Sequence, residues 1–222
     1  MKKQILSIAA ILCVAIVMTS CKDNKKEATT TEEKEVAEVD ATAVDYKVNT
    51  EKSTIMWKGE KPTGTHYGTI DLSEGIVAVN NGAVEGGKFT IDMTSIVSLD
   101  LEGKGKESLE SHLMGTVEGK EGDFFNVNKY PTATFELTGI SEKEGKTMVS
   151  GNLTIKDKTN NIEFPAAVSF TGNEMSLLSE EFAIDRTKWD VNYGSKSVFD
   201  NLGDKFINDD MEIQIELYAT KS

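Results

Sequence analysis

The sequence predicts an all-β protein, in which about eight antiparallel strands close into one extended barrel with a single short inserted helix. Most segments after residue 44 alternate apolar and polar side chains, which is the two-residue period of a strand with one buried face. Turn residues such as Asn81-Gly82 separate these segments. Only one segment, residues 104–114, has clear helical spacing, with Leu109 and Leu113 four residues apart.

Closure into a barrel is favoured because it leaves no exposed sheet edge, and an eight-stranded barrel is wide enough for one small ligand. A sandwich of two sheets would give the same periodicity, so the sequence alone leaves both architectures open. A second irregular segment, residues 195–207, is predicted to be a loop with a helical turn. The strand-like segments, in chain order, are 46–48, 55–57, 66–70, 75–79, 89–93, 133–137, 149–155, 162–170, 175–186 and 211–219.

Residues 1–20 have the pattern of an export signal. Two lysines precede an apolar run from Ile5 to Met18, and small residues then lead to Cys21. The run is too short to span a bilayer comfortably. This pattern resembles a bacterial lipoprotein signal, whose cysteine is acylated, for example with palmitate, and becomes the first residue. We therefore expect a lipoprotein anchored through Cys21 in the cell envelope, periplasmic or associated with the outer membrane.

Residues 21–43 are predicted to form a disordered tether carrying the lipidated cysteine, and residues 44–222 the folded domain. The tether is rich in Glu, Lys, Thr and Ala and has no aromatic residue, so it can bury little apolar surface. Cys13 and Cys21 are the two cysteines of the chain, which leaves none for a disulfide or a catalytic thiol within the domain. The formal charge of −13 argues against nucleic acid as a partner.

Known catalytic and metal motifs are absent from the sequence. It contains no GxSxG or HExxH pattern, and its two histidines are too few for most histidine-based metal sites. Gly115–Lys120 is one residue short of a phosphate-binding loop, and the aspartates near residue 204 miss the spacing of a calcium loop. We therefore expect a protein that is not an enzyme and has neither a cofactor nor a metal.

Several motifs in the domain occur in a recognisable order. They are ESHL at 110–113, DFF at 123–125, YPTATF at 130–135, GNLTI at 151–155, IDR at 184–186 followed by Trp189 and Tyr193-Gly194, and FDNLGD at 199–204. Together they resemble the YceI-like family of periplasmic and secreted proteins, over about residues 44–219. The chain departs from the family pattern in the turn at Lys156–Thr159 and in a longer loop at Gly115–Gly122.

The resemblance implies an extended lipocalin-like antiparallel barrel that binds a polyisoprenoid lipid in its interior. Five phenylalanines share the inward phase and are the expected ligand-lining residues: Phe89, Phe135, Phe164, Phe170 and Phe182. Three titratable side chains with apolar neighbours are candidates for contacts to the lipid head group: His66, His112 and Arg186. His66 and Arg186 could instead pair with a carboxylate at the barrel rim, and His112 could instead be a surface histidine. Trp57 and Trp189 are expected in the core.

Two functions without catalysis remain in competition at this point, ahead of an isomerase-like or hydrolytic enzyme for which nothing in the sequence names a nucleophile. The first is a membrane-tethered protein that carries or sequesters an apolar, polyisoprenoid-type lipid. The second is a stress-adaptation or interaction protein without enzymatic activity, whose barrel is packed solid and holds no ligand. The expected partners are the lipid and, through acylated Cys21, the membrane, and the sequence leaves a homodimer open.

Overall fold

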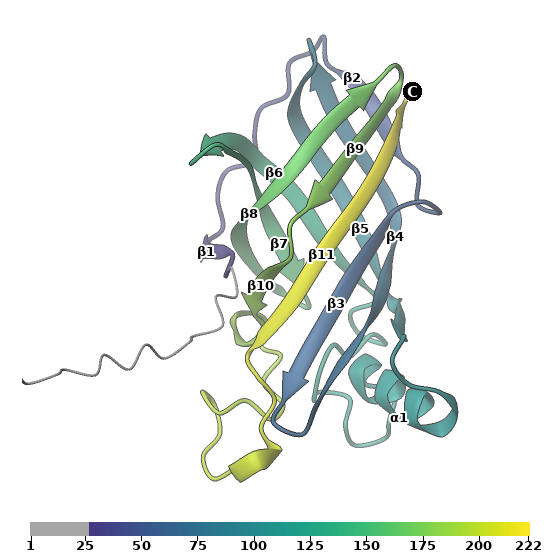
Figure 1. The fold of residues 1–222 in the computed structure, drawn as a ribbon, viewed down its shortest axis with the longest axis vertical. Helices are drawn as coiled ribbons and strands as arrows, with labels where there is room; N and C mark the ends of the chain where they lie inside the picture. Colours follow the sequence, from purple (N-terminus) through teal and green to yellow (C-terminus); the bar gives the residue numbers. More distant parts are fainter. Residues whose placement is uncertain (1–26) are drawn as a thin grey trace, which may run out of the picture.

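The computed structural model describes residues 27–222, so the predicted signal and the acylation site at Cys21 lie outside the described residues. Eight antiparallel strands form a closed ring (Figure 1). Around the ring these are β8 (Lys158–Thr171), β7 (Lys146–Ile155), β6 (Thr132–Lys143), β5 (Ala83–Ser98), β4 (Gly64–Asn80), β3 (Thr54–Lys61), β11 (Asp210–Lys221) and β9 (Glu174–Ser179). Because β9 pairs with both β11 and β8, the sheet has no free end along this path. The predicted antiparallel closure is confirmed, and the sandwich is not formed.

Three further strands lie beside the ring. β2 (Val44–Val48) pairs with β4 and β11 near the end drawn at the top of Figure 1. β10 (Phe182–Asp185) continues from β9 along the lower half of β11, and β1 (Thr29–Glu32) pairs with β8. The ring is uneven, because the long pair of β4 and β5 changes register at three places.

The predicted helix is α1 (Gly103–Met114), and two short 3-10 helices follow later, η1 (Arg186–Trp189) and η2 (Gly203–Lys205). Gly115 ends α1 with a left-handed backbone and donates its N–H to carbonyls of the last turn. In Figure 1, α1 and the loop around η2 lie at the same, lower end of the ring, which we call the mouth end. None of the helices in residues 27–222 is long and apolar enough to cross a membrane.

Both tryptophans are buried, as the sequence predicts. Trp189 is completely inaccessible to solvent, and its indole N–H donates to the carbonyl of Leu153 at 2.9 Å. Trp57 is nearly as buried, and its N–H donates to the carbonyl of Thr69. Each indole N–H has a backbone acceptor, which removes the penalty of burying an unpaired donor.

The prediction of a disordered tether is wrong for its described part, residues 27–43. This segment runs along the outside of the ring: Thr29–Glu32 pairs with β8, and Lys34 exchanges two hydrogen bonds with the side chain of Asn152 on β7. Further on, Val39 packs over Gly86 of β5. Composition misled the prediction, because a short polar strand needs only an open sheet edge and gains its order from backbone pairing rather than from apolar burial.

Candidate functional site

The inside of the ring encloses a cavity of about 120 Å³. Every strand of the ring contributes to its lining, as does β10, and every lining residue is apolar or glycine. This follows from the strand period, since the alternate side chains that point inward are the apolar ones. A cavity with such walls offers water no hydrogen-bonding partner and suits a hydrocarbon.

Four of the five predicted phenylalanines line this cavity: Phe89, Phe135, Phe164 and Phe182. Their rings form a continuous row from β5 to β10. The ring centroids of Phe89 and Phe135 are 6.1 Å apart, those of Phe135 and Phe164 are 6.0 Å apart, and Phe164 stacks on Phe182 at 4.4 Å with an interplanar angle of 9°. This row of rings, which we call the phenylalanine row, forms the part of the cavity wall between β5 and β10.

Phe170 does not line the cavity. It lies near the upper end of β8, where its ring meets the edge of Tyr46 at 5.8 Å. The alternation of side chains identifies the inward face of β8 correctly, but it carries no information on how far along the ring the cavity extends. Phe170 therefore lies on the predicted face of β8 but beyond the end of the cavity.

Two glycines make room for rings of the phenylalanine row, and no pattern in the sequence indicates this role. A Cβ on Gly151 of β7 would lie 2.5 Å from Cε1 of Phe135 and closer still to Cζ. A Cβ on Gly75 of β4 would lie 2.8 Å from Cδ1 of Phe89. These glycines therefore let each ring lie flat against the strand wall. Spacing alone could not reveal this, because each contact joins different strands.

A second pocket, of about 330 Å³, lies at the mouth end. It shares Ile70, Phe125 and Met211 with the interior cavity, so the two spaces adjoin at these side chains. The three predicted head-group residues, His66, His112 and Arg186, all line this mouth pocket. They come from β4, α1 and η1, which the fold brings together at one end of the ring.

Each histidine is paired with a carboxylate. His66 Nδ1 lies 2.7 Å from Asp100 Oδ2, and His112 Nε2 lies 2.7 Å from Asp123 Oδ2. Partial burial acts to raise the pKa of Asp100, but hydrogen bonds from His66, the Tyr67 N–H and Ser98 outweigh it and hold that pKa below its ordinary value. Asp100 is therefore ionised at neutral pH and fixes the orientation of the imidazole.

An aromatic cluster surrounds His112. Its ring meets the edge of Phe124 at 5.1 Å and that of Tyr193 at 4.9 Å, and the last two are 5.3 Å apart. Tyr193 stays 42% exposed, so one face of this cluster is open to solvent. The DFF motif places Phe124 here, but nothing in the sequence indicated that Tyr193 or the aspartate partners would join the histidines.

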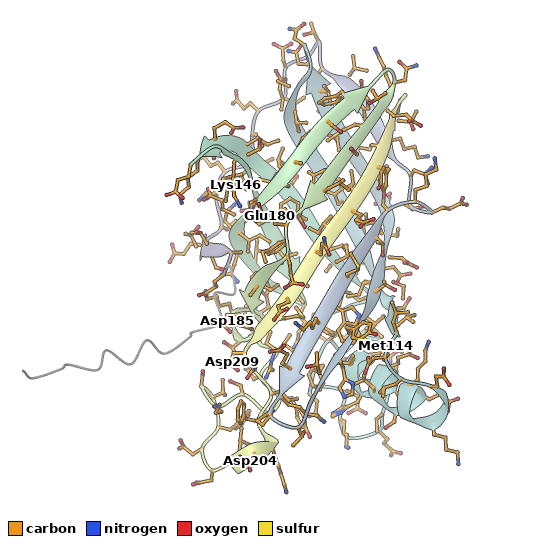
Figure 2. The ribbon with its side chains drawn as sticks, in the orientation of Figure 1. Met114, Lys146, Glu180, Asp185, Asp204 and Asp209 are labelled. Carbon is orange, nitrogen blue, oxygen red and sulfur yellow. The ribbon has the colours of Figure 1, made fainter. Side chains whose placement is uncertain are left out.

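Arg186 stabilises the loop at the mouth rather than presenting a free charge. The residue is only 4% exposed, and its side chain donates to the carbonyls of Asn208, Val191 and Ile207. Burial lowers its pKa below the usual arginine value, against the opposing influence of the nearby Asp209. Figure 2 shows Asp209 and Asp185 close together at the lower end of β10 and β11. Two other positively charged residues, Lys61 and Lys205, also line the mouth pocket.

Within residues 27–222, no group of three or more His, Cys, Asp or Glu side chains is arranged to hold a metal ion. What the site offers instead is a dry apolar chamber joined to a partly polar pocket. The chamber can take a hydrocarbon chain, and the pocket carries hydrogen-bonding groups of both charges, Lys61 and Lys205 beside Glu60 and Asp210, for a small polar group.

The family model described as "YceI-like domain" matches residues 46–219. A UPF0312 protein of Pseudomonas paraeruginosa is 38% identical over 55 residues, which is 25% of this chain and 29% of that protein. The match thus spans less than a third of the length of this curated relative.

Two solved structures share the fold. The BcnA protein of Burkholderia cenocepacia superposes with a TM-score of 0.60 at 24% identity, over 78% of this chain and 99% of that one. A polyisoprenoid-binding domain of Saccharophagus degradans, described as implicated in plant cell wall breakdown, gives a TM-score of 0.55 at 12% identity, over 81% of this chain and 99% of that domain.

Proposed function

Because the chain belongs to the YceI-like family, we propose that its strand ring binds the hydrocarbon chain of a long apolar lipid of the polyisoprenoid type. The observation that carries this proposal is the entirely apolar cavity adjoining a pocket with polar side chains. The lipid's tail occupies the cavity, and its polar head lies in the mouth pocket near His66 and His112. Support also comes from the shared fold of a domain described as polyisoprenoid-binding.

The cavity must widen to accept a long chain. Its volume of about 120 Å³ is close to that of an engineered cavity of roughly 150 Å³ that holds benzene, and below the roughly 300–1,000 Å³ of usual ligand pockets. The phenylalanine row borders the space that the lipid needs. Because the rings of Phe135 and Phe89 already fill the wall space over Gly151 and Gly75, binding requires the strands or the other lining side chains to move apart.

The small cavity also favours a second candidate. In this alternative the phenylalanine row is a permanent part of a packed core, no lipid enters, and the protein acts through its outer surface as an interaction or stress-adaptation protein. The stacked pair of Phe164 and Phe182 would be expected in such a core. A lipid-dependent change in stability separates the two functions.

We expect the delipidated protein to melt higher when a polyprenyl lipid is added. A ligand present at about 100 times its Kd stabilises the folded state by about 2.7 kcal/mol, which corresponds to roughly 5–10 °C for a domain of this size. Phe135→Trp and Phe164→Trp should each reduce this rise, because a larger ring fills the cavity. Thermal melting with and without lipid measures both effects.

Phe170→Trp is the matched control, because Phe170 lies on the same strand as Phe164 but does not line the cavity. It should keep the lipid-dependent rise of the wild type. If no lipid raises the melting temperature of the wild-type protein, the packed ring becomes the better account.

We also propose that acylated Cys21 is the membrane attachment, which makes the protein a carrier or store of lipid at the envelope membrane. The signal pattern before Cys21 motivates this. Cys21→Ser should move the protein from the membrane fraction to the soluble fraction of lysed cells. A variant that sediments with membranes as the wild type does would contradict the lipid anchor.

A further inference from the structure

The wall of the ring has a seam on one side. β9 pairs with β8 down to Ser179, and the last backbone hydrogen bond between these strands runs from the Glu180 N–H to the Pro165 carbonyl at 3.0 Å. Below this point β10 follows β11, and among the described residues no backbone pair joins β10 to β8. In Figure 2 the seam runs from Glu180, beside Lys146, down to Asp185.

Two aromatic side chains meet on the cavity side of the seam. Phe164 of β8 and Phe182 of β10 stack at 4.4 Å. Both line the interior cavity, so this pair lies between the seam and the cavity. Two stacked rings are held by apolar contact and can part by rotation, whereas paired strands must break a ladder of hydrogen bonds.

The gap between the two strands is filled by the N-terminal segment, which pairs through its backbone with the edges of both. The Ala28 N–H donates to the Ala183 carbonyl of β10 at 2.8 Å, and the next residues, Thr29–Glu32, pair with residues 160–163 of β8. Ala28 itself is only 4% exposed. A single short segment thus bridges the two strands that the ring leaves unpaired, and we call residues 27–32 the cover strand.

The cover strand is held weakly compared with the rest of the wall. It pairs with β8 at four positions and has one bridge to β10, between Glu27 and Ala183, whereas β7 and β8 are paired over eight positions. Its sequence, EATTTE, buries the small side chain of Ala28 but no large apolar side chain. A clasp follows it, where the nearly buried amide of Asn152 donates to and accepts from the backbone of Lys34. Short, polar and exposed elements of this kind open locally at low free-energy cost.

We propose that this seam is the opening through which the lipid's hydrocarbon chain passes, with the cover strand as the part of the wall that moves aside. This inference rests on the proposed lipid binding. The route from the mouth pocket passes between Ile70, Phe125 and Met211, and a long chain would have to thread end-on through it. The seam instead admits the chain sideways along its length. It ends next to Arg186, so the head group can remain in the mouth pocket.

The position of the cover strand suits transfer from a bilayer. Glu27 follows Cys21 after five intervening residues, which makes six steps along the chain, and a fully extended chain spans at most about 3.6 Å per step, or roughly 20 Å in all. An acyl anchor on Cys21 would therefore keep the seam within about 20 Å of the membrane. Any pull on the lipid anchor would act on the cover strand, because the cover strand follows the anchor closely along the chain.

A disulfide that joins the cover strand to β8 tests the seam as a route. Thr29 and Glu163 are antiparallel partners with side chains on the outer face, so Thr29→Cys with Glu163→Cys can be bridged. A chain beginning at Lys22 keeps every described residue and contains no other cysteine. Thr90→Cys with Thr134→Cys places the same bridge between β5 and β6, where no opening is proposed.

The measured quantity is the rate at which each protein takes up a dansyl-labelled polyprenyl alcohol from phosphatidylcholine vesicles. With the seam bridge oxidised, uptake and release should both slow at least ten-fold while the equilibrium Kd stays within two-fold, and dithiothreitol should restore the wild-type rates in the same sample. The β5–β6 bridge should leave the rates unchanged. Wild-type rates in the oxidised seam variant would overturn the seam as the route. Failure of the wild type itself to bind the probe would instead overturn the proposed function.

Discussion

Arg186→Met is expected to lower the free energy of unfolding by about 3–5 kcal/mol, because it leaves buried polar groups without their partner. The guanidinium hydrogen-bonds three backbone carbonyls in the mouth loop, and Asp209 lies 3.7 Å away with one oxygen buried. Methionine fills a similar volume but donates no hydrogen bond. Urea unfolding of the wild type and the variant measures the difference.

Arg186→Lys separates charge from geometry at the same position. Lysine keeps the positive charge near Asp209, but one ammonium group cannot reproduce the planar fork that serves three carbonyls. We expect Arg186→Lys to lower the free energy of unfolding by less than Arg186→Met does. A loss below about 1 kcal/mol for Arg186→Met, the range of an ordinary surface change, would mean that the mouth loop does not depend on this side chain.

Gly151→Ala should reduce both stability and lipid binding. The new methyl group would lie 2.5 Å or less from the ring of Phe135, so the ring must move into the cavity. Overpacking of this kind costs about 1–3 kcal/mol, and the displaced ring would occupy space that the lipid needs. Chemical unfolding gives the first effect, and titration with a polyprenyl lipid gives the second, with Kd expected to rise at least ten-fold.

Gly139→Ala is the matched control for this substitution. Gly139 lies on the neighbouring strand β6, and a Cβ built there has no heavy atom within 4 Å. The change should leave lipid affinity unaltered and stability equal or slightly higher, since alanine restricts the unfolded chain. Equal losses of affinity in both variants would show that the effect of Gly151→Ala does not arise from contact with Phe135.

The sequence predicts the ring and most of its lining because both depend on a local pattern. Alternation of apolar and polar side chains assigns the inward face of each strand, and glycine and asparagine turns separate the strands. Phe89, Phe135, Phe164 and Phe182 are therefore found without knowledge of the structure. Phe170 has the same phase, yet it lies beyond the cavity, because a period of two residues defines a face and not a depth.

The parts that the sequence does not predict depend on contacts between distant residues. His66 meets Asp100 and His112 meets Asp123 only once β4, α1 and the following loop fold against one end of the ring. The cover strand is a polar segment whose composition indicates disorder, and its order comes from an unpaired edge of β8 more than 120 residues later. Arg186 is unusual in the sequence as a charged residue among apolar neighbours, but its three carbonyl partners belong to irregular segments that no hydrophobic period predicts.

Native mass spectrometry of the freshly purified protein tests the central claim most directly, because it weighs whatever the ring holds. The account predicts a population heavier than the bare chain by the mass of one apolar lipid, which organic extraction removes and added polyprenyl lipid restores. Phe164→Trp should reduce the heavy population, and Phe170→Trp should retain it. A protein that appears only at the mass of the bare chain, before and after addition of lipid, would contradict lipid binding and leave the ring as a packed core.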